Sequence, residues 1–236
     1  MKQTRLWLLV LAIGALPSMG WAWHDETHLA IARAAGYVKW FNAAGADMLK
    51  IKAGDIENKN HFVSNPPGTL VKAQMVLEQV ERYDRPDHPQ GHLYGAIIAA
   101  LRQYRTTTRT GKYAEYHLAF CAHYVGDLSQ PLHNTLYNVY NQRYHAATDA
   151  VINAEVLDHP SLIRIYPIAI GSEADLAREV ARIATLSLQL GYRLEREGRM
   201  LSRTEAYEQI SHSASLFRAI LFWLGHAPVS SVPAAD

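Results

Sequence analysis

The strongest constraint on the fold is the spacing of apolar residues, which follows the 3.6-residue period of an α-helix in each long segment. Leu93, Ile97 and Leu101, for example, fall on one face of a helix that Pro89 and Gly91 precede. No segment alternates apolar and polar residues between hairpin turns, so we expect no strands. The pattern predicts an all-α protein, a single-domain multi-helix bundle with long loops.

The expected helices are unevenly distributed along the chain. They begin near residues 25, 69, 91, 112 and 144, and the two longest span about 173–196 and 203–224. Segments 52–68 and 129–143 are rich in glycine, proline and asparagine and are predicted to be loops. Loops of this length inside a compact domain are often functional. No linker or shift in composition divides residues 23–236, which we therefore expect to form one domain.

The first 22 residues have the pattern of a signal peptide. Lys2 and Arg5 precede an apolar run over 6–16, and small residues follow up to Ala22. The run is shorter than the roughly 18 residues that a membrane-spanning helix needs. We therefore expect cleavage after Ala22 and a secreted or periplasmic mature protein without a transmembrane segment.

The amino-acid composition limits the kinds of functional site that this chain can form. The chain is 49% hydrophobic and 19% charged, which is typical of a globular protein, and its net charge of +1 gives no bulk attraction for polyanions. Cys121 is the only cysteine, so an intramolecular disulfide is excluded. Twelve histidines beside one cysteine favour a metal site built from imidazole and carboxylate ligands rather than thiolates.

The densest motif is HYVGDLSQPLH, at residues 123–133. His123 and Asp127 are four residues apart, so both side chains leave the same face of a helix. The helix is expected to end near Pro131, which lets His133 fold back towards that face. His145 and Asp149 repeat the four-residue spacing on the next predicted helix. Such pairs on facing helices are how helical bundles hold metal ions, so we predict a metal site here.

Three further features supply donors of the same kind. Cleavage after Ala22 makes Trp23 the first mature residue, and its free amine and carbonyl oxygen can chelate a metal ion. His28 follows closely, and Asp55 and His61 lie six residues apart in the first long loop. Each of these features alone is more often structural, so only their combination points to a site.

Taken in order, these residues resemble the zinc-dependent phospholipase C and S1/P1 nuclease superfamily over essentially the whole mature chain. The block at 123–133 is similar to the family's His-Tyr/Phe-x-Gly-Asp-x-x-x-Pro-x-His core, and the tryptophan at the cleavage point is a second match. The matching residues are Trp23, His28, Asp55, His61, His123, Asp127, His133, His145 and Asp149.

The resemblance implies a cluster of three zinc ions. One ion would be held by Asp55, His61, His123 and Asp127, one by Trp23, His28 and Asp127, and the more exposed ion by His133, His145 and Asp149. Asp127 would bridge the first two, and Asp55 would orient or deprotonate the attacking water. The interval from Asp55 to His61 is shorter than in the family, and Asp47 and Glu57 are the nearest alternatives to Asp55.

The activity that the resemblance implies is hydrolysis of a phosphate ester by an exported trizinc phosphodiesterase. The short interval between His133 and His145 and the Asp-x-Glu-Asn run at 55–58 favour a phospholipase C acting on phospholipids, with transient contact to a membrane surface. Asp149 is more typical of the nucleases, so a single-strand nuclease or 3'-nucleotidase acting on nucleic acid or nucleotides is the alternative. No obligate protein partner is indicated.

Two other classes stay open. The segment HDETH at 24–28 places two histidines four residues apart, as a zinc metalloprotease does. Its glutamate is at the wrong position for His-Glu-x-x-His or for the inverted motif. A helical protein that binds zinc without catalysis would also explain the ligand pattern.

Overall fold

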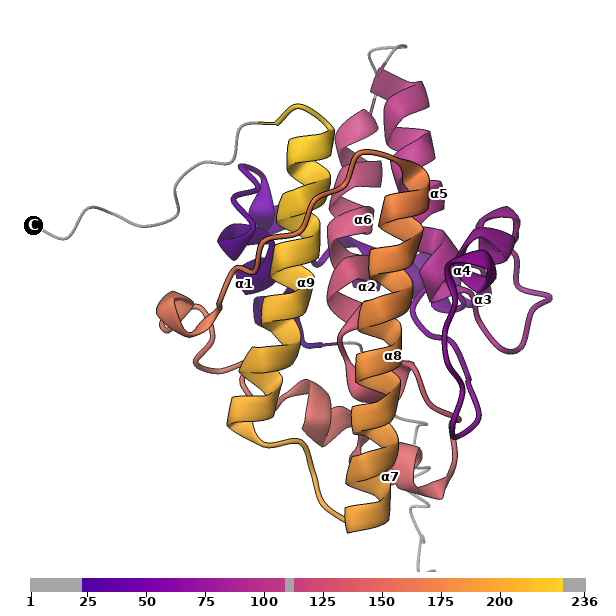
Figure 1. Cartoon of the computed structure of the whole chain (residues 1–236), viewed down its shortest axis with the longest axis vertical. Coiled ribbons are helices and arrows are strands. Elements are labelled where there is room, and N and C mark those ends of the chain that lie inside the picture. Colours follow the sequence, from indigo (N-terminus) through magenta and orange to yellow (C-terminus); the bar gives the residue numbers. More distant parts are fainter. Residues whose placement is uncertain (1–22, 109–112, 227–236) are drawn as a thin grey trace, which may run out of the picture.

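The computed structural model describes residues 23–108 and 113–226, and in these ranges the predicted all-α class is confirmed (Figure 1). The predicted signal peptide, 1–22, lies outside the described residues. The α-helices are α1 (Asp25–Ala34), α2 (Gly45–Ala53), α3 (Asp55–Asn58), α4 (Ala73–Gln79), α5 (Leu93–Thr108), α6 (Ala114–Leu128), α7 (Val139–Asp149), α8 (Glu173–Glu197) and α9 (Arg203–Trp223). In the described ranges the only β-pairing is an isolated bridge between Asn65 and Thr135.

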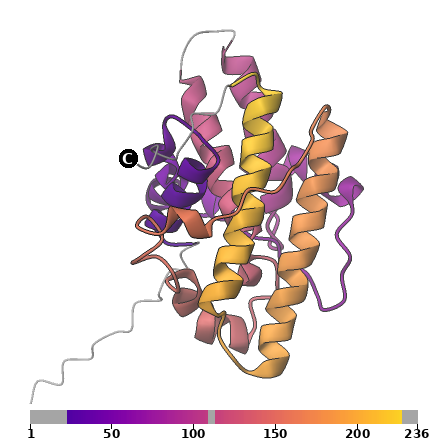
Figure 2. The ribbon, with the colours of Figure 1, turned by 60° about the vertical axis from the view of Figure 1, so that its left-hand side comes forward.

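The two longest helices, α8 and α9, lie side by side and antiparallel along one face of the molecule (Figures 1 and 2). Behind them α5 and α6 form a second pair, and α1 packs against both α6 and α9. The main hydrophobic core fills the space between these layers, with Tyr94, Tyr124 and Phe217 among its largest buried side chains. A second cluster gathers Trp23, α1, segment 152–163 and parts of α8 and α9.

Side-chain caps explain why α8 and α9 match their predicted ranges to within a residue. The Ser172 side chain accepts from the backbone N–H of Asp175 and starts α8, and Gly198, at φ 62°, ends it in the left-handed conformation that suits glycine. Ser202 and Glu205 form a reciprocal capping box at the start of α9. These caps fix the turn between the two helices.

The predicted loop at 52–68 is wrong in its first part. Helix α2 runs to Ala53, and after Gly54, at φ 57°, a single helical turn forms α3. The N-cap of α2 is Ala44, which makes no side-chain hydrogen bond, so no capping signal marks its start. Helix α7 begins at Val139, earlier than predicted, because the Asn138 side chain caps it by accepting from the N–H of Asn141.

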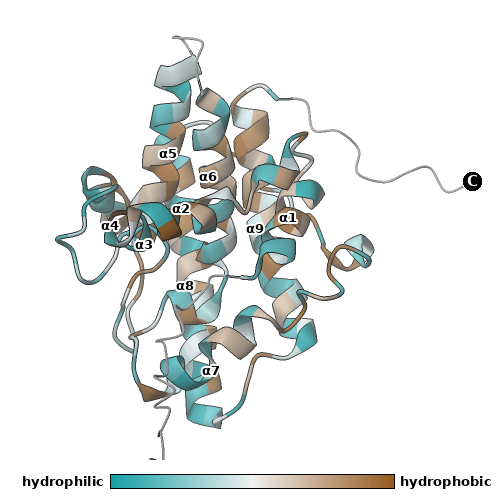
Figure 3. Cartoon of the chain, turned by 180° about the vertical axis from the view of Figure 1, so that it is seen from behind, coloured by the Kyte–Doolittle hydropathy of each residue, from teal (hydrophilic) through white to brown (hydrophobic). Residues whose placement is uncertain are grey.

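Helix α6 is the central element. From Leu118 onwards almost all of its side chains are buried, because α1, α2, α5, α8 and α9 surround it. Seen from behind, α2 and α3 lie near α6, with α7 at the lower end of the molecule (Figure 3). None of the helices in the described ranges has the length and hydropathy that a bilayer span requires. Because other helices surround α6, its polar side chains lie in the protein interior and need partners there.

Candidate metal centre

Three groups of histidine and aspartate side chains meet around the C-terminal half of α6. In each group the candidate ligand atoms lie within 4.8 Å of one another, a separation that one ion could bridge. Within the described ranges the groups are His28 with His123 and Asp127, Asp47 with His61 and His123, and His133 with His145 and Asp149. The structure therefore contains several buried groups that could hold metal ions.

The first group joins α1 to α6. The His28 ring stacks on the His123 ring, with centroids 3.7 Å apart. Nε2 of His28 lies 3.4 Å from Oδ1 of Asp127. Gly126 makes this approach possible, because a Cβ atom there would stand 2.4 Å from Nδ1 of His28. Burial lowers the pKa of His28 to about 4, so the ring is neutral and can offer a lone pair.

The second group adds α2 and the segment after α3. His61 Nδ1 lies 2.8 Å from Oδ2 of Asp127 and 3.2 Å from Nε2 of His123. Asp47 faces the same point, with its Oδ1 3.5 Å from His123 Nε2 and 3.8 Å from His61 Nδ1. His123 and Asp127 thus connect the first two groups into one continuous cluster.

This cluster favours positive charge. Burial alone would lower the pKa of His123, but the carboxylates of Asp47 and Asp127 raise it to about 10. Burial likewise tends to raise the pKa of both carboxyl groups, yet the His123 imidazolium holds the pKa of each well below the usual range, helped at Asp47 by the Lys50 ammonium. Two buried, ionised carboxylates flanking imidazoles are an environment in which a cation compensates the desolvation cost.

In the third group, two neutral histidine rings contact each other through ring nitrogens that do not share a hydrogen bond. Nε2 of His133 and Nε2 of His145 face each other at 3.0 Å. Nδ1 of His133 donates to the backbone oxygen of His61, and Nδ1 of His145 donates to Oδ1 of Asn141. Both of these oxygens can only accept. Each Nδ1 therefore carries the proton, and two lone pairs point at one another.

Burial keeps both rings neutral. It lowers the pKa of His133 to about 4 and also lowers that of His145. Oδ2 of Asp149 lies 3.4 Å from His145 Nε2 and accepts no hydrogen bond from any residue that the structure describes. The Gln130 amide donates to the other oxygen of Asp149 and fixes its orientation. A cation between these donors would satisfy all three atoms at once.

Most predicted ligands meet in these groups, but Asp55 does not. It is exposed on α3, and Asp47, which is 2% exposed, takes the place beside His61 and His123. The prediction of Asp55 as part of this group is corrected accordingly. The reason is that α2 packs on α6 and turns Asp47 inward, whereas the single turn of α3 leaves Asp55 facing solvent.

Trp23 occupies a position next to the third group. Its side chain is fully buried in the second hydrophobic cluster, and the N–H of the following residue, His24, donates to the carbonyl of Asp149 over 3.5 Å. The start of the described chain is thereby held beside the cluster. Ligation by the Trp23 amine stays a prediction.

A cleft of about 520 Å³ gives access to the second and third groups. Its lining includes Asp47, Lys50 and Ile51 from α2, together with Tyr137 and His145. Lys50 makes an ion pair with Asp47 at 2.6 Å, and only 12% of its side chain is exposed. The lining of the cleft combines apolar side chains with a few charged ones, as sites for small polar ligands commonly do.

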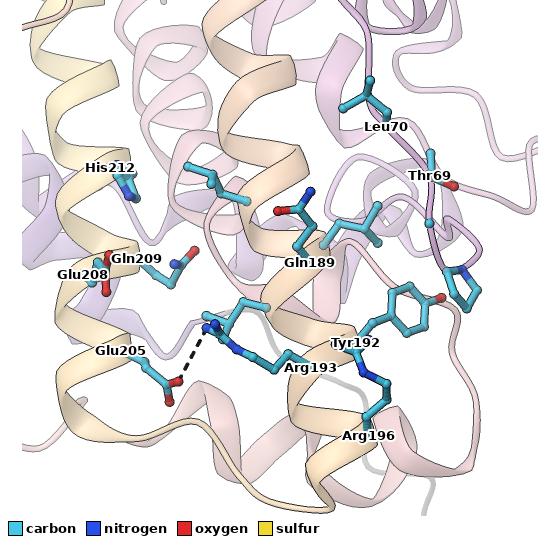
Figure 4. A pocket seen from close by; sticks show the side chains of 15 residues that line it. Thr69, Leu70, Gln189, Tyr192, Arg193, Arg196, Glu205, Glu208, Gln209 and His212 are labelled. Carbon is cyan, nitrogen blue, oxygen red and sulfur yellow. Dashed lines mark ion pairs between the residues drawn. The ribbon is translucent and has the colours of Figure 1, made fainter.

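A second cavity, of about 600 Å³, lies along α8 and α9 (Figure 4). Some of its lining side chains have polar partners: Arg193 approaches Glu205, also in the lining, at 3.8 Å, and the Tyr192 hydroxyl donates to the backbone carbonyl of Asn65. None of the three groups of candidate ligands found among the described residues lies in its walls.

Comparison of the sequence with models of protein families and with curated proteins finds no match. The class of this site consequently rests on its residues and its geometry.

Proposed function

We propose that this protein is an exported zinc-dependent hydrolase of phosphate ester bonds, with three zinc ions and phospholipase C-like activity on phospholipids. The observation that carries the proposal is the 3.0 Å separation of Nε2 of His133 from Nε2 of His145, beside the buried carboxyl group of Asp149. Neutral imidazoles with carboxylates and no thiolate are a donor set that suits zinc.

The ligand sets of the proposal follow the three groups. Asp47, His61, His123 and Asp127 would hold one ion, and His28 with Asp127 another, joined by the amine and carbonyl of Trp23 once cleavage after Ala22 has freed them. His133, His145 and Asp149 would hold the third ion. Asp47 thus replaces Asp55 in the set that the resemblance implied.

Bound zinc ions supply Lewis acidity, which acidifies water and neutralises charge on a phosphoryl group. The chain's own residues complete the site. The ionised Asp47 carboxylate lines the cleft and can accept a hydrogen bond from a water molecule there and so orient it. The Lys50 ammonium lies beside it and can donate hydrogen bonds to a phosphate oxygen.

The walls of the cleft support a phospholipid substrate. Ile51, Phe62 and Leu132 present apolar surface next to Lys50 and the metal groups, so a phosphate and its glycerol attachment would meet charged and apolar surface together. The net charge of the chain, near zero, gives little attraction for a long polyanion.

A single-strand nuclease is the second candidate, and one observation favours it. The Tyr137 side chain lines the cleft with 57% of its surface exposed, and its ring centroid lies 6.3 Å from that of His145. An exposed aromatic ring beside the phosphate site can stack on a nucleobase.

The test compares two substrates. Mature protein beginning at Trp23 is expected to hydrolyse phosphatidylcholine vesicles faster than single-stranded DNA, and a chelator should abolish both activities until zinc is restored. Faster turnover of DNA would favour the single-strand nuclease over the phospholipase. Undiminished hydrolysis in chelator, or cleavage of casein without any phosphodiester turnover, would contradict it.

A further inference from the structure

Glu57 is a buried carboxylate outside the three metal-binding groups. It lies on α3 and is 1% exposed. Its Oε1 lies 3.0 Å from Nε2 of His61 and accepts a hydrogen bond from the Tyr124 hydroxyl over 2.7 Å. Its Oε2 accepts from the Asn60 side chain at 3.1 Å. Burying a carboxylate is costly, so this well-connected position needs an explanation.

The position of Glu57 determines which nitrogen of His61 faces the cluster. A carboxylate can only accept, so Nε2 of His61 carries a proton and donates it to Glu57. Nδ1 faces the point that His61 shares with Asp47, His123 and Asp127, whose Oδ2 lies 2.8 Å away, so a cation at that point would take the place of the Nδ1 proton and meet the Nδ1 lone pair. The Tyr124 ring packs edge-on against the His61 ring at 5.4 Å and limits its rotation.

Glu57 also differs from the other acceptors around the centre. The outward nitrogens of His123, His133 and His145 donate to neutral oxygens: the carbonyl of Ala43, the carbonyl of His61 and the side-chain amide of Asn141. Among these four rings, His61 alone donates outward to a negatively charged group. A carboxylate behind an imidazole makes the ring a stronger electron donor, which tightens its bond to a metal ion.

We infer that Glu57 is the positioning residue of the metal centre, fixing the tautomer of His61 and strengthening the ion held by Asp47, His61 and His123. The inference rests on the proposed function. It assigns to Glu57 a specific effect on one of the three ions, through His61 and without direct contact to that ion.

The experiment measures zinc affinity rather than turnover. Purified Glu57→Gln and Glu57→Met variants are titrated with zinc against a chromophoric chelator, and their cobalt-substituted forms are compared by visible absorption. Glutamine keeps an oxygen for His61 but removes the charge, and methionine removes the acceptor at similar volume. We expect one ion to bind about 10-fold more weakly in the first variant and up to about 100-fold more weakly in the second. The cobalt bands of that ion should shift, while the other two ions keep wild-type affinity.

Glu115→Gln is the control, because Glu115 also accepts from a tyrosine hydroxyl, that of Tyr37, at 3.0 Å and pairs with Lys39, but has no hydrogen bond or ion pair with a histidine in the described part of the chain. Tyr124→Phe is a second variant, for use if Glu57→Met lowers the stability of the protein. It removes a donor to Glu57 and keeps the ring contact to His61, so it should weaken zinc binding less than Glu57→Met does. Equal zinc affinity in wild type and Glu57→Met would overturn the role of Glu57 alone. A wild-type chain that binds no zinc would overturn the proposed function as well.

Discussion

Replacing Asp47 with asparagine is expected to lower phosphodiesterase activity by more than about 100-fold, whereas Asp55→Asn leaves activity within about twofold of wild type. Loss of a residue that only orients a ligand typically costs 10- to 100-fold, and Asp47 is proposed to contact the ion itself. Its carboxylate is buried and faces His61 and His123, while Asp55 is an exposed residue in the lining of the same cleft. Steady-state hydrolysis of a chromogenic phosphodiester measures both effects.

The two variants are a matched pair, since each converts one carboxylate near the cleft to its amide. Metal content should follow activity, with one ion lost from Asp47→Asn and none from Asp55→Asn. The reverse ranking of the two variants would restore Asp55 as the ligand and would contradict the positions of α2 and α3 in the site.

Asp127→Asn is expected to have the largest effect on metal content, reducing it from three ions to one. Asp127 belongs to the first group and also lies 2.8 Å from His61 in the second, so it serves both proposed ions. Its removal also leaves the buried His123 imidazolium with one carboxylate fewer, which should reduce the free energy of unfolding of the metal-free protein by about 3–5 kcal/mol. Metal analysis and denaturant unfolding in chelator give the two values.

Asp149→Asn is the control for this prediction. The amide oxygen of the new side chain can still accept from the Gln130 amide, and Asp149 belongs only to the third group. This variant should therefore lose one ion and retain two. If Asp127→Asn also retained two ions, Asp127 would not bridge the first two groups, and the proposed arrangement of ligands would be wrong.

The parts of the site that could be predicted from sequence are those with a local helical pattern. His123 with Asp127, and His145 with Asp149, share a helix face because their spacing is four residues, and the structure places each pair in one group. The ranges of α8 and α9 could also be predicted from the sequence, because each helix has a long apolar period and a serine cap at its start. Both kinds of signal depend only on neighbours along the chain.

Asp47 and Glu57 could not be placed in the same way. Helix α2 has no side-chain cap, so there is little sign in the sequence that Asp47 lies on a helix facing α6. Glu57 precedes His61 by four residues, but its role depends on Tyr124, which comes from α6. Contacts between distant segments decide both positions, and a single sequence does not contain them.

The zinc content of the mature protein tests the central claim most directly. Protein beginning at Trp23 and purified without chelators, then analysed by mass spectrometry of its metals, should contain about three zinc ions per chain. Fully folded protein with essentially no divalent metal, and with no gain in thermal stability on zinc addition, would contradict the account.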